Sequence, residues 1–273
     1  MIRVFRTYYP FAKATVKSEY FAYKSRFLLW ATANSVNFLA QLFLWKAIYD
    51  NSADSIIKGY SYSEMVVYLG ISKIVECMSF ASIEKKVSKG IRDGEIVNSL
   101  IKPINYKTEL LFSSLGQIFG STCLFLPIYL FTLFLFGKFN GVKVGVNAGN
   151  LLVSFLFLAI AFMLNYYISL ISSAIIIKTI KHSGIYQLKK TLVSFFAGAL
   201  FPISFYPDFL QTAINYMPFV YLRFYPTIVM QGKISVRESL MTLSVGFFWV
   251  IVLGVIASAL WKRTIKKIMV FGG

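Results

Sequence analysis

The sequence has few charged residues, one histidine and two cysteines. Asp, Glu, Lys and Arg make up 14% of its 273 residues, compared with about 25% in a typical soluble domain. The chain therefore lacks the polar residues that cover a water-soluble domain, which argues against a soluble enzyme and against a disordered tail. Cys77 and Cys123 are too few for a disulfide framework, and we expect both to be reduced packing residues.

Sequence motifs of common catalytic sites are also missing. The chain has no G-x-x-x-x-G-K-[ST] phosphate loop, no H-E-x-x-H zinc motif, no G-x-S-x-G nucleophile and no metal-spaced cluster of Cys and His. Its one histidine, His182, is in a short basic segment without an acidic neighbour. We therefore expect no catalytic residue, no metal site and no cofactor in this chain, which is not an enzyme by itself.

Long apolar runs dominate what remains, with hydrophobic residues at 57%. A bilayer core of roughly 30 Å needs about 20 apolar residues in a helix, and the runs do not alternate strictly as barrel strands do. The prediction is an all-α integral membrane protein with one transmembrane domain over residues 1–273. Its six transmembrane helices are expected at about 27–49, 61–82, 110–136, 149–177, 191–206 and 241–261.

The positions of Lys and Arg predict the orientation. Of these 28 residues, 20 lie in 1–26, 83–109, 178–190 and 262–273, and six lie in the segments on the opposite side. Because cytoplasmic segments carry an excess of Lys and Arg, both termini are predicted to be cytoplasmic, in a multi-pass protein of the cell membrane. The net charge of +17 then faces anionic lipid head groups, which argues against a nucleic-acid partner.

Three segments outside the spans have patterns of their own. Residues 1–26 interleave aromatic and basic residues at helical spacing, which predicts an interfacial helix, with plain basic flanking as the alternative. The segment 83–109 predicts two short amphipathic helices that dock on a partner, with a solvated loop as the alternative. The segment 207–240 is too apolar for a free loop, but its prolines forbid a continuous span. It predicts short helices that re-enter the outer leaflet.

Polar residues inside the predicted spans are candidate functional residues. Three amides fall on one face of the first span and predict either interhelical hydrogen bonds or the lining of a transport pathway: Asn34, Asn37 and Gln41. In the second span, Lys73 and Glu76 are three residues apart and can neutralise each other. Glu64 has no evident partner in the sequence and is a functional candidate for that reason.

Short residue groups in a fixed order carry a family resemblance over nearly the whole chain. They are Gly59-Tyr60 with Glu64-Met65 and Tyr68; Gly94-Glu95-Ile96 with Leu100-Ile101-Lys102-Pro103; Gly198 with Phe201-Pro202 and Tyr206-Pro207; and Pro218-Phe219 with Tyr225-Pro226 and Gln231-Gly232. In this order and spacing the chain resembles the membrane permease subunit of type-two (ABC-2-like) ABC exporters, in their small bacterial stand-alone branch. It departs from many relatives at Ala197-Gly198, where they have Ser-Gly or Gly-Gly.

The resemblance implies partners and site residues. Such permeases pair with themselves or with a sister permease, and they sit on two separately encoded ATPase subunits that bind ATP and Mg. The loop after the second span docks on the ATPase, which implies coupling residues at Gly90, Arg92, Asp93, Gly94, Glu95, Lys102 and Pro103. Candidate substrate-pathway residues are Asn34, Asn37, Gln41, Glu64, Phe195 and Phe201. The implied outer gate contains Pro202, Pro207, Pro218 and Pro226.

The function expected from these features is ATP-driven export. The chain would move a hydrophobic or amphipathic drug, peptide or lipid-like substrate outward by alternating access. A secondary transporter or channel, and a non-transporting sensor or immunity subunit on the same scaffold, are the alternatives. An intramembrane enzyme would need a cluster of acids or histidines at one interface, which the sequence does not have.

Overall fold

The computed structural model describes residues 2–18, 24–96, 101, 103–140, 148–179 and 182–271. Their regular secondary structure is helical apart from a short antiparallel hairpin of β1 (Ile56–Ile57) and β2 (Tyr60–Ser61). This confirms the all-α class. The helices are α1 (Ile2–Val16), α2 (Lys24–Asp50), α3 (Tyr62–Ser79), α4 (Glu84–Arg92), α6 (Tyr106–Asn140), α7 (Ala148–Thr179), α8 (His182–Phe196), α9 (Asp208–Asn215), α10 (Phe224–Met230) and α11 (Val236–Phe271).

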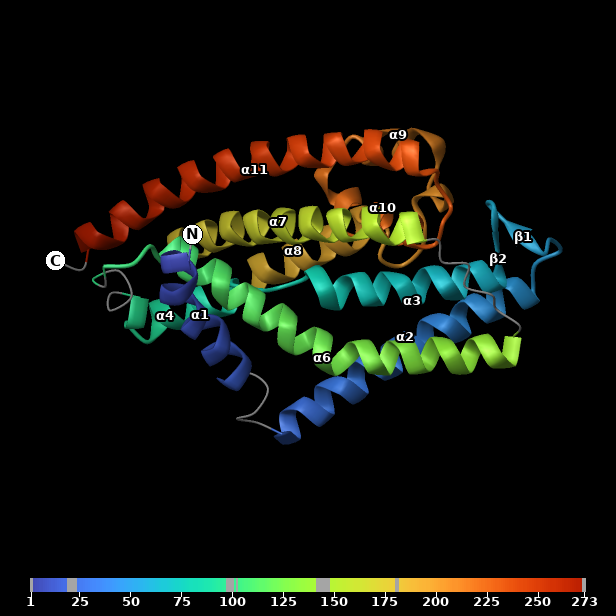
Figure 1. The fold of residues 1–273 in the computed structure, drawn as a ribbon, viewed down its shortest axis with the longest axis horizontal. Helices are drawn as coiled ribbons and strands as arrows, with labels where there is room; N and C mark the ends of the chain where they lie inside the picture. Colours follow the sequence, from blue (N-terminus) through green and yellow to red (C-terminus); the bar gives the residue numbers. More distant parts are fainter. Residues whose placement is uncertain are drawn as a thin grey trace.

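The long helices run along one common direction, which gives the molecule two distinct ends (Figure 1). Both chain ends lie at the same end of the bundle as α4, and the β1–β2 hairpin lies at the other. We call these the α4 end and the hairpin end. Helix α11 packs along α7, and α3 packs along α6. Helix α6 changes direction partway along its length (Figure 1), and Pro127 inside it supplies a cause, since proline removes a helical hydrogen bond.

Three helical segments of the described chain are long and apolar enough to cross a membrane: Tyr106–Leu135, Leu152–Thr179 and Val236–Lys266. Helices α3 and α4 form a fourth candidate if they count as one span bent by 41°. The predicted number of six spans is therefore not confirmed. Helix α2 has 27 residues but carries three amides and Lys46, and α8 has 15 residues, fewer than the roughly 20 that a bilayer core needs.

The predicted fifth span, 191–206, differs from the observed helix. Helix α8 begins at His182 and ends at Phe196, so most of the predicted span is not α-helical. The chain turns at Gly198, whose φ of +70° is the left-handed region that favours glycine. Pro202 then precedes a 3₁₀ turn over Ile203–Phe205. Apolar composition alone did not show that the helix stops at this glycine.

Helix α1 is held against α6. The backbone N–H of Asn105 donates a hydrogen bond to the Tyr8 hydroxyl at 2.8 Å, and a Cβ added at Gly116 would clash with the backbone of Ala12. The Gly116-x-x-x-Gly120 pattern therefore marks a close helix contact at its first glycine. The predicted interfacial helix over 1–26 is helical from Ile2 to Val16; its position relative to a membrane stays a prediction.

The segment 207–240 forms short helices, as its prolines predict: α9, a 3₁₀ helix over Pro218–Leu222, and α10. It reaches far into the bundle. The Arg223 guanidinium lies 2.7 Å from the Glu76 carboxylate, and the Gln231 amide donates to the carbonyl of Glu64 at 2.8 Å. The two glutamates are 12 residues apart on α3, which is roughly 18 Å at 1.5 Å per residue. The segment therefore runs along most of α3 before it returns to the hairpin end.

Replacing Gly198 by alanine is expected to destabilise the fold. The left-handed backbone costs an alanine about 1–2 kcal/mol, and the new Cβ would lie 2.9 Å from the Tyr68 hydroxyl. That hydroxyl donates a buried 2.6 Å hydrogen bond to the carbonyl of Gly198. Gly198→Ala should lower the free energy of unfolding in detergent by about 2 kcal/mol, measured by denaturant titration of tryptophan fluorescence.

The control is Gly184→Ala in α8. A Cβ at Gly184 has no atom within 4 Å, and alanine is favoured over glycine inside a helix by roughly 0.5–1 kcal/mol. This variant should be as stable as the unmodified chain or more so. Equal stability of the two alanine variants would show that the turn at Gly198 does not constrain the fold.

Candidate functional site

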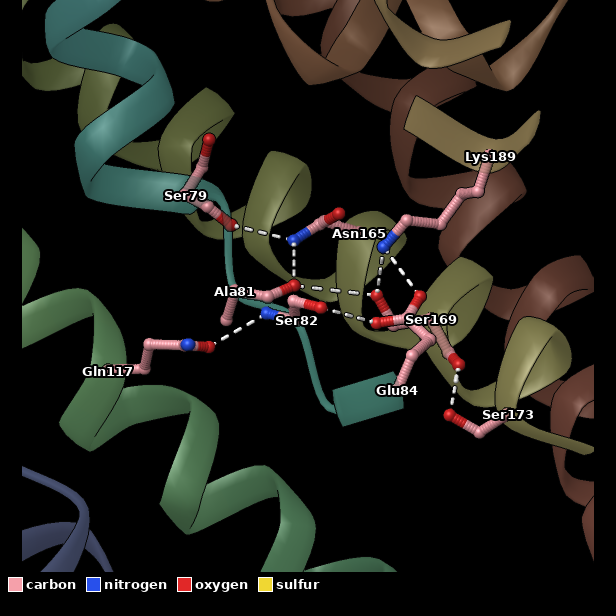
Figure 2. A network of polar contacts seen from close by, with 9 residues as sticks. All are labelled: Ser79, Ala81, Ser82, Glu84, Gln117, Asn165, Ser169, Ser173 and Lys189. Carbon is pink, nitrogen blue, oxygen red and sulfur yellow. Dashed lines mark hydrogen bonds and ion pairs between the residues drawn. The ribbon is translucent and has the colours of Figure 1, made fainter. Parts of the chain in front are cut away.

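The link between α3 and α4 is bound to neighbouring helices by its backbone (Figure 2). The Asn165 amide of α7 donates to the carbonyl of Ser79, the last residue of α3, at 3.3 Å and to the carbonyl of Ala81 in the link at 3.0 Å. From the other side, the side-chain oxygen of Gln117 on α6 accepts from the backbone N–H of Ser82 at 2.7 Å. Polar side chains thus fix the point at which the chain leaves α3 and starts α4.

A buried ion pair closes this network. Lys189 Nζ of α8 lies 2.6 Å from Glu84 Oε1, and the two side chains are 4% and 0% exposed. The ammonium also donates to the Ser169 hydroxyl of α7 at 2.9 Å, and the Ser82 hydroxyl donates to Glu84 at 2.9 Å (Figure 2). Because a buried charge that loses its partner is strongly unfavourable, the first residue of α4 is held firmly to α7 and α8.

Helix α4 is also attached to α6. Lys86 Nζ donates to Glu109 at 2.7 Å and to the Ser113 hydroxyl at 2.8 Å. Val87 is fully buried on the same helix, in a cluster with Leu110 and Leu170. The first residues of α4 are therefore attached to α6, α7 and α8.

The far end of α4 faces outward. Arg92, Asp93, Gly94 and Glu95 are exposed, and Arg92 pairs with Asp93 at 3.3 Å. Gly94 has a φ of +73°, which lets the chain turn after the helix. Gly90 is buried and Pro103 is exposed, whereas Lys102 lies outside the described residues. The predicted second amphipathic helix falls partly outside them as well.

A cavity of about 190 Å³ lies between these elements and the bundle. Its walls come from α2, α3, the link between α3 and α4, α4, α6, α8 and the residue before α10. The described residues that line it are Asn34, Glu76, Cys77, Phe80, Lys85, Ser121, Phe125, Tyr129, Tyr186, Lys190, Val193, Ser194 and Arg223. Lys85 and Lys190 are exposed at the α4 end, and Arg223 is buried. The cavity therefore extends from that end into the bundle.

Glu76 holds two cations at this cavity. Its carboxylate lies 2.7 Å from Arg223 and 3.5 Å from Lys73. The predicted pairing of Lys73 with Glu76 is present, but Arg223 is the closer partner. The count of Lys and Arg residues had assigned Arg223 to a segment on the outer side of the membrane. In the structure Arg223 is buried beside α3.

Tyrosine hydroxyls near the two ends of the bundle stay protonated at neutral pH. Burial, followed by the nearby Glu84 carboxylate, raises the pKa of Tyr186 above its usual value. Burial, followed by Glu64, does the same for the pKa of Tyr60. Both groups can therefore act as neutral hydrogen-bond donors.

At the hairpin end Glu64 is paired, and the expectation that it lacks a partner is wrong. Its carboxylate lies 2.7 Å from Lys233 and accepts from the backbone N–H of Ser61, which completes a capping box at the start of α3. The Lys233 ammonium also lies 4.0 Å from the Tyr60 ring centroid. The sequence hid this contact because Lys233 is 169 positions away from Glu64.

The other predicted pathway residues are not all brought together. Asn34 lines the cavity, whereas Asn37 is exposed and accepts from the Gln41 amide at 3.4 Å. Phe195 and Phe201 both contact the Tyr206 ring, at 5.1 Å and 5.0 Å between centroids. A role for these residues in transport stays a prediction.

The predicted gate prolines mark the starts of short elements. Pro202 precedes the 3₁₀ turn, Pro207 precedes α9, and Pro218 opens the next 3₁₀ helix. Pro226 is buried within α10.

The sequence analysis missed several site residues: Glu84, Lys189, Arg223 and the two cavity lysines, Lys85 and Lys190. In the sequence each of them resembles an ordinary charge that flanks an apolar run, and no local pattern identifies its partner.

Comparison with known families decides the class of the protein. A family model described as "ABC-2 family transporter protein" matches residues 35–271. The chain belongs to this family. Comparison with curated proteins and with solved structures gives no match. As an ABC-2 family member the chain is a membrane permease subunit of an ABC transporter and is not itself catalytic. Membership also implies association with ATP-binding cassette partners.

Within the described residues, no group of three or more His, Cys, Asp or Glu could hold a metal ion.

Removing one member of the buried ion pair should destabilise this ABC-2 permease. Lys189→Met leaves the Glu84 carboxylate buried without a cation, at a cost of about 3–5 kcal/mol in the free energy of unfolding. Glu84→Gln together with Lys189→Met should recover a large part of that loss. Denaturant titration in detergent measures all three variants.

Lys190→Met is the matched control because Lys190 is adjacent and exposed. It should change the free energy of unfolding by less than about 1 kcal/mol. Strictly additive effects of the Glu84 and Lys189 substitutions would contradict the assigned pair.

Proposed function

We propose that the chain is the membrane subunit of an ATP-driven exporter, with two separate ATPase subunits and a second permease, identical or sister. ATP and Mg bind in the ATPase subunits. Substrate moves outward across the cell membrane by alternating access between two conformations. Both termini are cytoplasmic, which places the α4 end on the side of the ATPases.

The attachment of α4 is the observation that carries this proposal. Its far end, Arg92 to Glu95, is exposed, while its first residue is joined to α8 by the buried Glu84–Lys189 pair. Lys86 joins the same helix to Glu109 of α6. A force applied by an ATPase at the exposed end would therefore reach α6 and α8 through short ionic contacts. A solvated loop would transmit no such force.

The two ends of the bundle differ in the way that export requires. At the α4 end the cavity opens between Lys85 and Lys190. At the hairpin end the chain is closed by Glu64–Lys233 and by an aromatic cluster in which the Phe205 ring lies 5.1 Å from that of Trp45 and 6.1 Å from that of Tyr60. An exporter that receives substrate from the cytoplasmic side starts from such an arrangement.

The proposed substrate is hydrophobic or amphipathic. The cavity wall includes aromatic rings, among which Phe125 and Tyr129 stack at 6.1 Å. Such rings bury apolar groups. A drug, a peptide or a lipid-like molecule would fit this description.

Alanine variants at the exposed end of α4 test the docking of the ATPase. Arg92→Ala and Glu95→Ala should each weaken co-purification with the partner ATP-binding cassette ATPase. The expected loss is about 1–2 kcal/mol, or roughly 5- to 30-fold in dissociation constant. ATP turnover of the complex in nanodiscs should fall in parallel.

Arg237→Ala is the control, since Arg237 is an exposed charge near the hairpin end. It should leave both the complex and its ATP turnover unchanged. A retained complex with unchanged turnover in the Arg92 and Glu95 variants argues against the docking role of α4. Transport by the purified chain alone, in vesicles without nucleotide, would rule out the proposal that the chain belongs to an ATP-driven exporter.

A further inference from the structure

The cavity carries more positive than negative charge. Of the described residues that line it, Glu76 is the one acid, whereas Lys85, Lys190 and Arg223 are basic. Glu76 is already bound at 2.7 Å by Arg223 and at 3.5 Å by Lys73. Its single negative charge cannot neutralise both partners, and it does not reach the two lysines at the mouth.

This excess has a direct electrostatic consequence. Arg223 is buried, and the cavity lies among apolar helices, so the excess charge acts at an effective dielectric constant well below that of water. A cationic ligand would add to the repulsion. An anionic group gains attraction from the two lysines and from the cation that Glu76 leaves uncompensated. Rings of Lys and Arg select anions in membrane pores for the same reason.

The rest of the wall suits an apolar chain attached to that anionic group. Phe80, Phe125 and Val193 line the same cavity as the charges. Tyr129, beside Phe125, also contacts Phe38 of α2 at 5.6 Å between ring centroids. A volume of about 190 Å³ holds a head group and the first carbons of a chain.

We propose that this cavity binds the anionic head group of an amphiphile, with Lys85, Lys190 and Arg223 facing the anion. The inference rests on the proposed export function and narrows its substrate class. The substrate has a phosphate or carboxylate head and an apolar chain. Cationic amphiphiles are excluded.

Binding of two matched probes to the full chain tests the charge preference. The chain is placed in nanodiscs of zwitterionic lipid, and radiolabelled dodecyl phosphate is compared with dodecyltrimethylammonium, which has the same chain length and opposite charge. Empty nanodiscs give the background. Dodecyl phosphate should bind at least tenfold more tightly. Equal affinity, or a preference for the cation, overturns the proposal without any substituted protein.

Substitutions on α4 and α8 then locate the site. Lys85→Gln should weaken the binding of dodecyl phosphate about tenfold, the order expected for one charge at about 10 Å in a medium of intermediate dielectric constant. Lys190→Gln should do the same. Lys89→Gln is the control, since Lys89 is an exposed residue one turn along α4 that does not line the cavity. If Lys89→Gln weakens binding as much as Lys85→Gln, the site is not this cavity.

Inorganic phosphate separates an amphiphile site from a site for soluble anions. It should not displace dodecyl phosphate at tenfold higher concentration. Displacement at equal concentration overturns the assignment of an amphiphile. These measurements use no ATPase, so an intact, ATP-hydrolysing complex with no anion preference would refute this inference alone. A chain that prefers dodecyl phosphate but binds no ATPase would refute the proposed function instead.

Discussion

The structure depends on one buried ion pair at the start of α4. Glu84 and Lys189 lie 2.6 Å apart and almost out of contact with solvent, where neither charge is tolerable without the other. Because they belong to α4 and α8, the pair joins two segments separated by 105 positions. The hydrogen bonds of Asn165 and Ser169 extend this joint to α7. The geometry of the cavity next to it follows from the same joint, since Lys85 and Lys190 are the immediate neighbours of the paired residues.

Composition and periodicity were sufficient for the coarse architecture. Apolar runs predicted an all-α membrane protein, the pattern of 83–109 predicted a short helix where α4 lies, and Pro207, Pro218 and Pro226 predicted short elements. The family followed from motif order and was confirmed by the match over 35–271. The ends of α8 were not predictable in this way. A stretch of Phe and Leu continues past Gly198, and the hydroxyl of Tyr68 that fixes this turn is 130 positions away.

The candidate site was predicted less well than the fold. Helical spacing identifies which residues share a face, so it found the Lys73–Glu76 pair. It also grouped Asn34 with Asn37, but Asn34 lines the cavity whereas Asn37 is exposed. It gives no information on contacts between distant segments. Three ion pairs join residues that are far apart in the sequence: Glu64 with Lys233, Glu84 with Lys189, and Glu76 with Arg223. The sequence analysis counted every Lys and Arg as a marker of membrane orientation, so it did not single out Lys189, Arg223 and Lys233, which form ion pairs.

The contact between Arg223 and Glu76 joins the segment 207–240 to α3 inside the bundle. Arg223 joins the segment 207–240 to Glu76, and Lys233 of the same segment joins it to Glu64. Any rearrangement that lifts this segment toward the hairpin end must separate a guanidinium from a carboxylate at 2.7 Å and leave Lys73, at 3.5 Å, as the nearest counter-ion. Moving this segment therefore has an electrostatic cost, which is set by a single arginine.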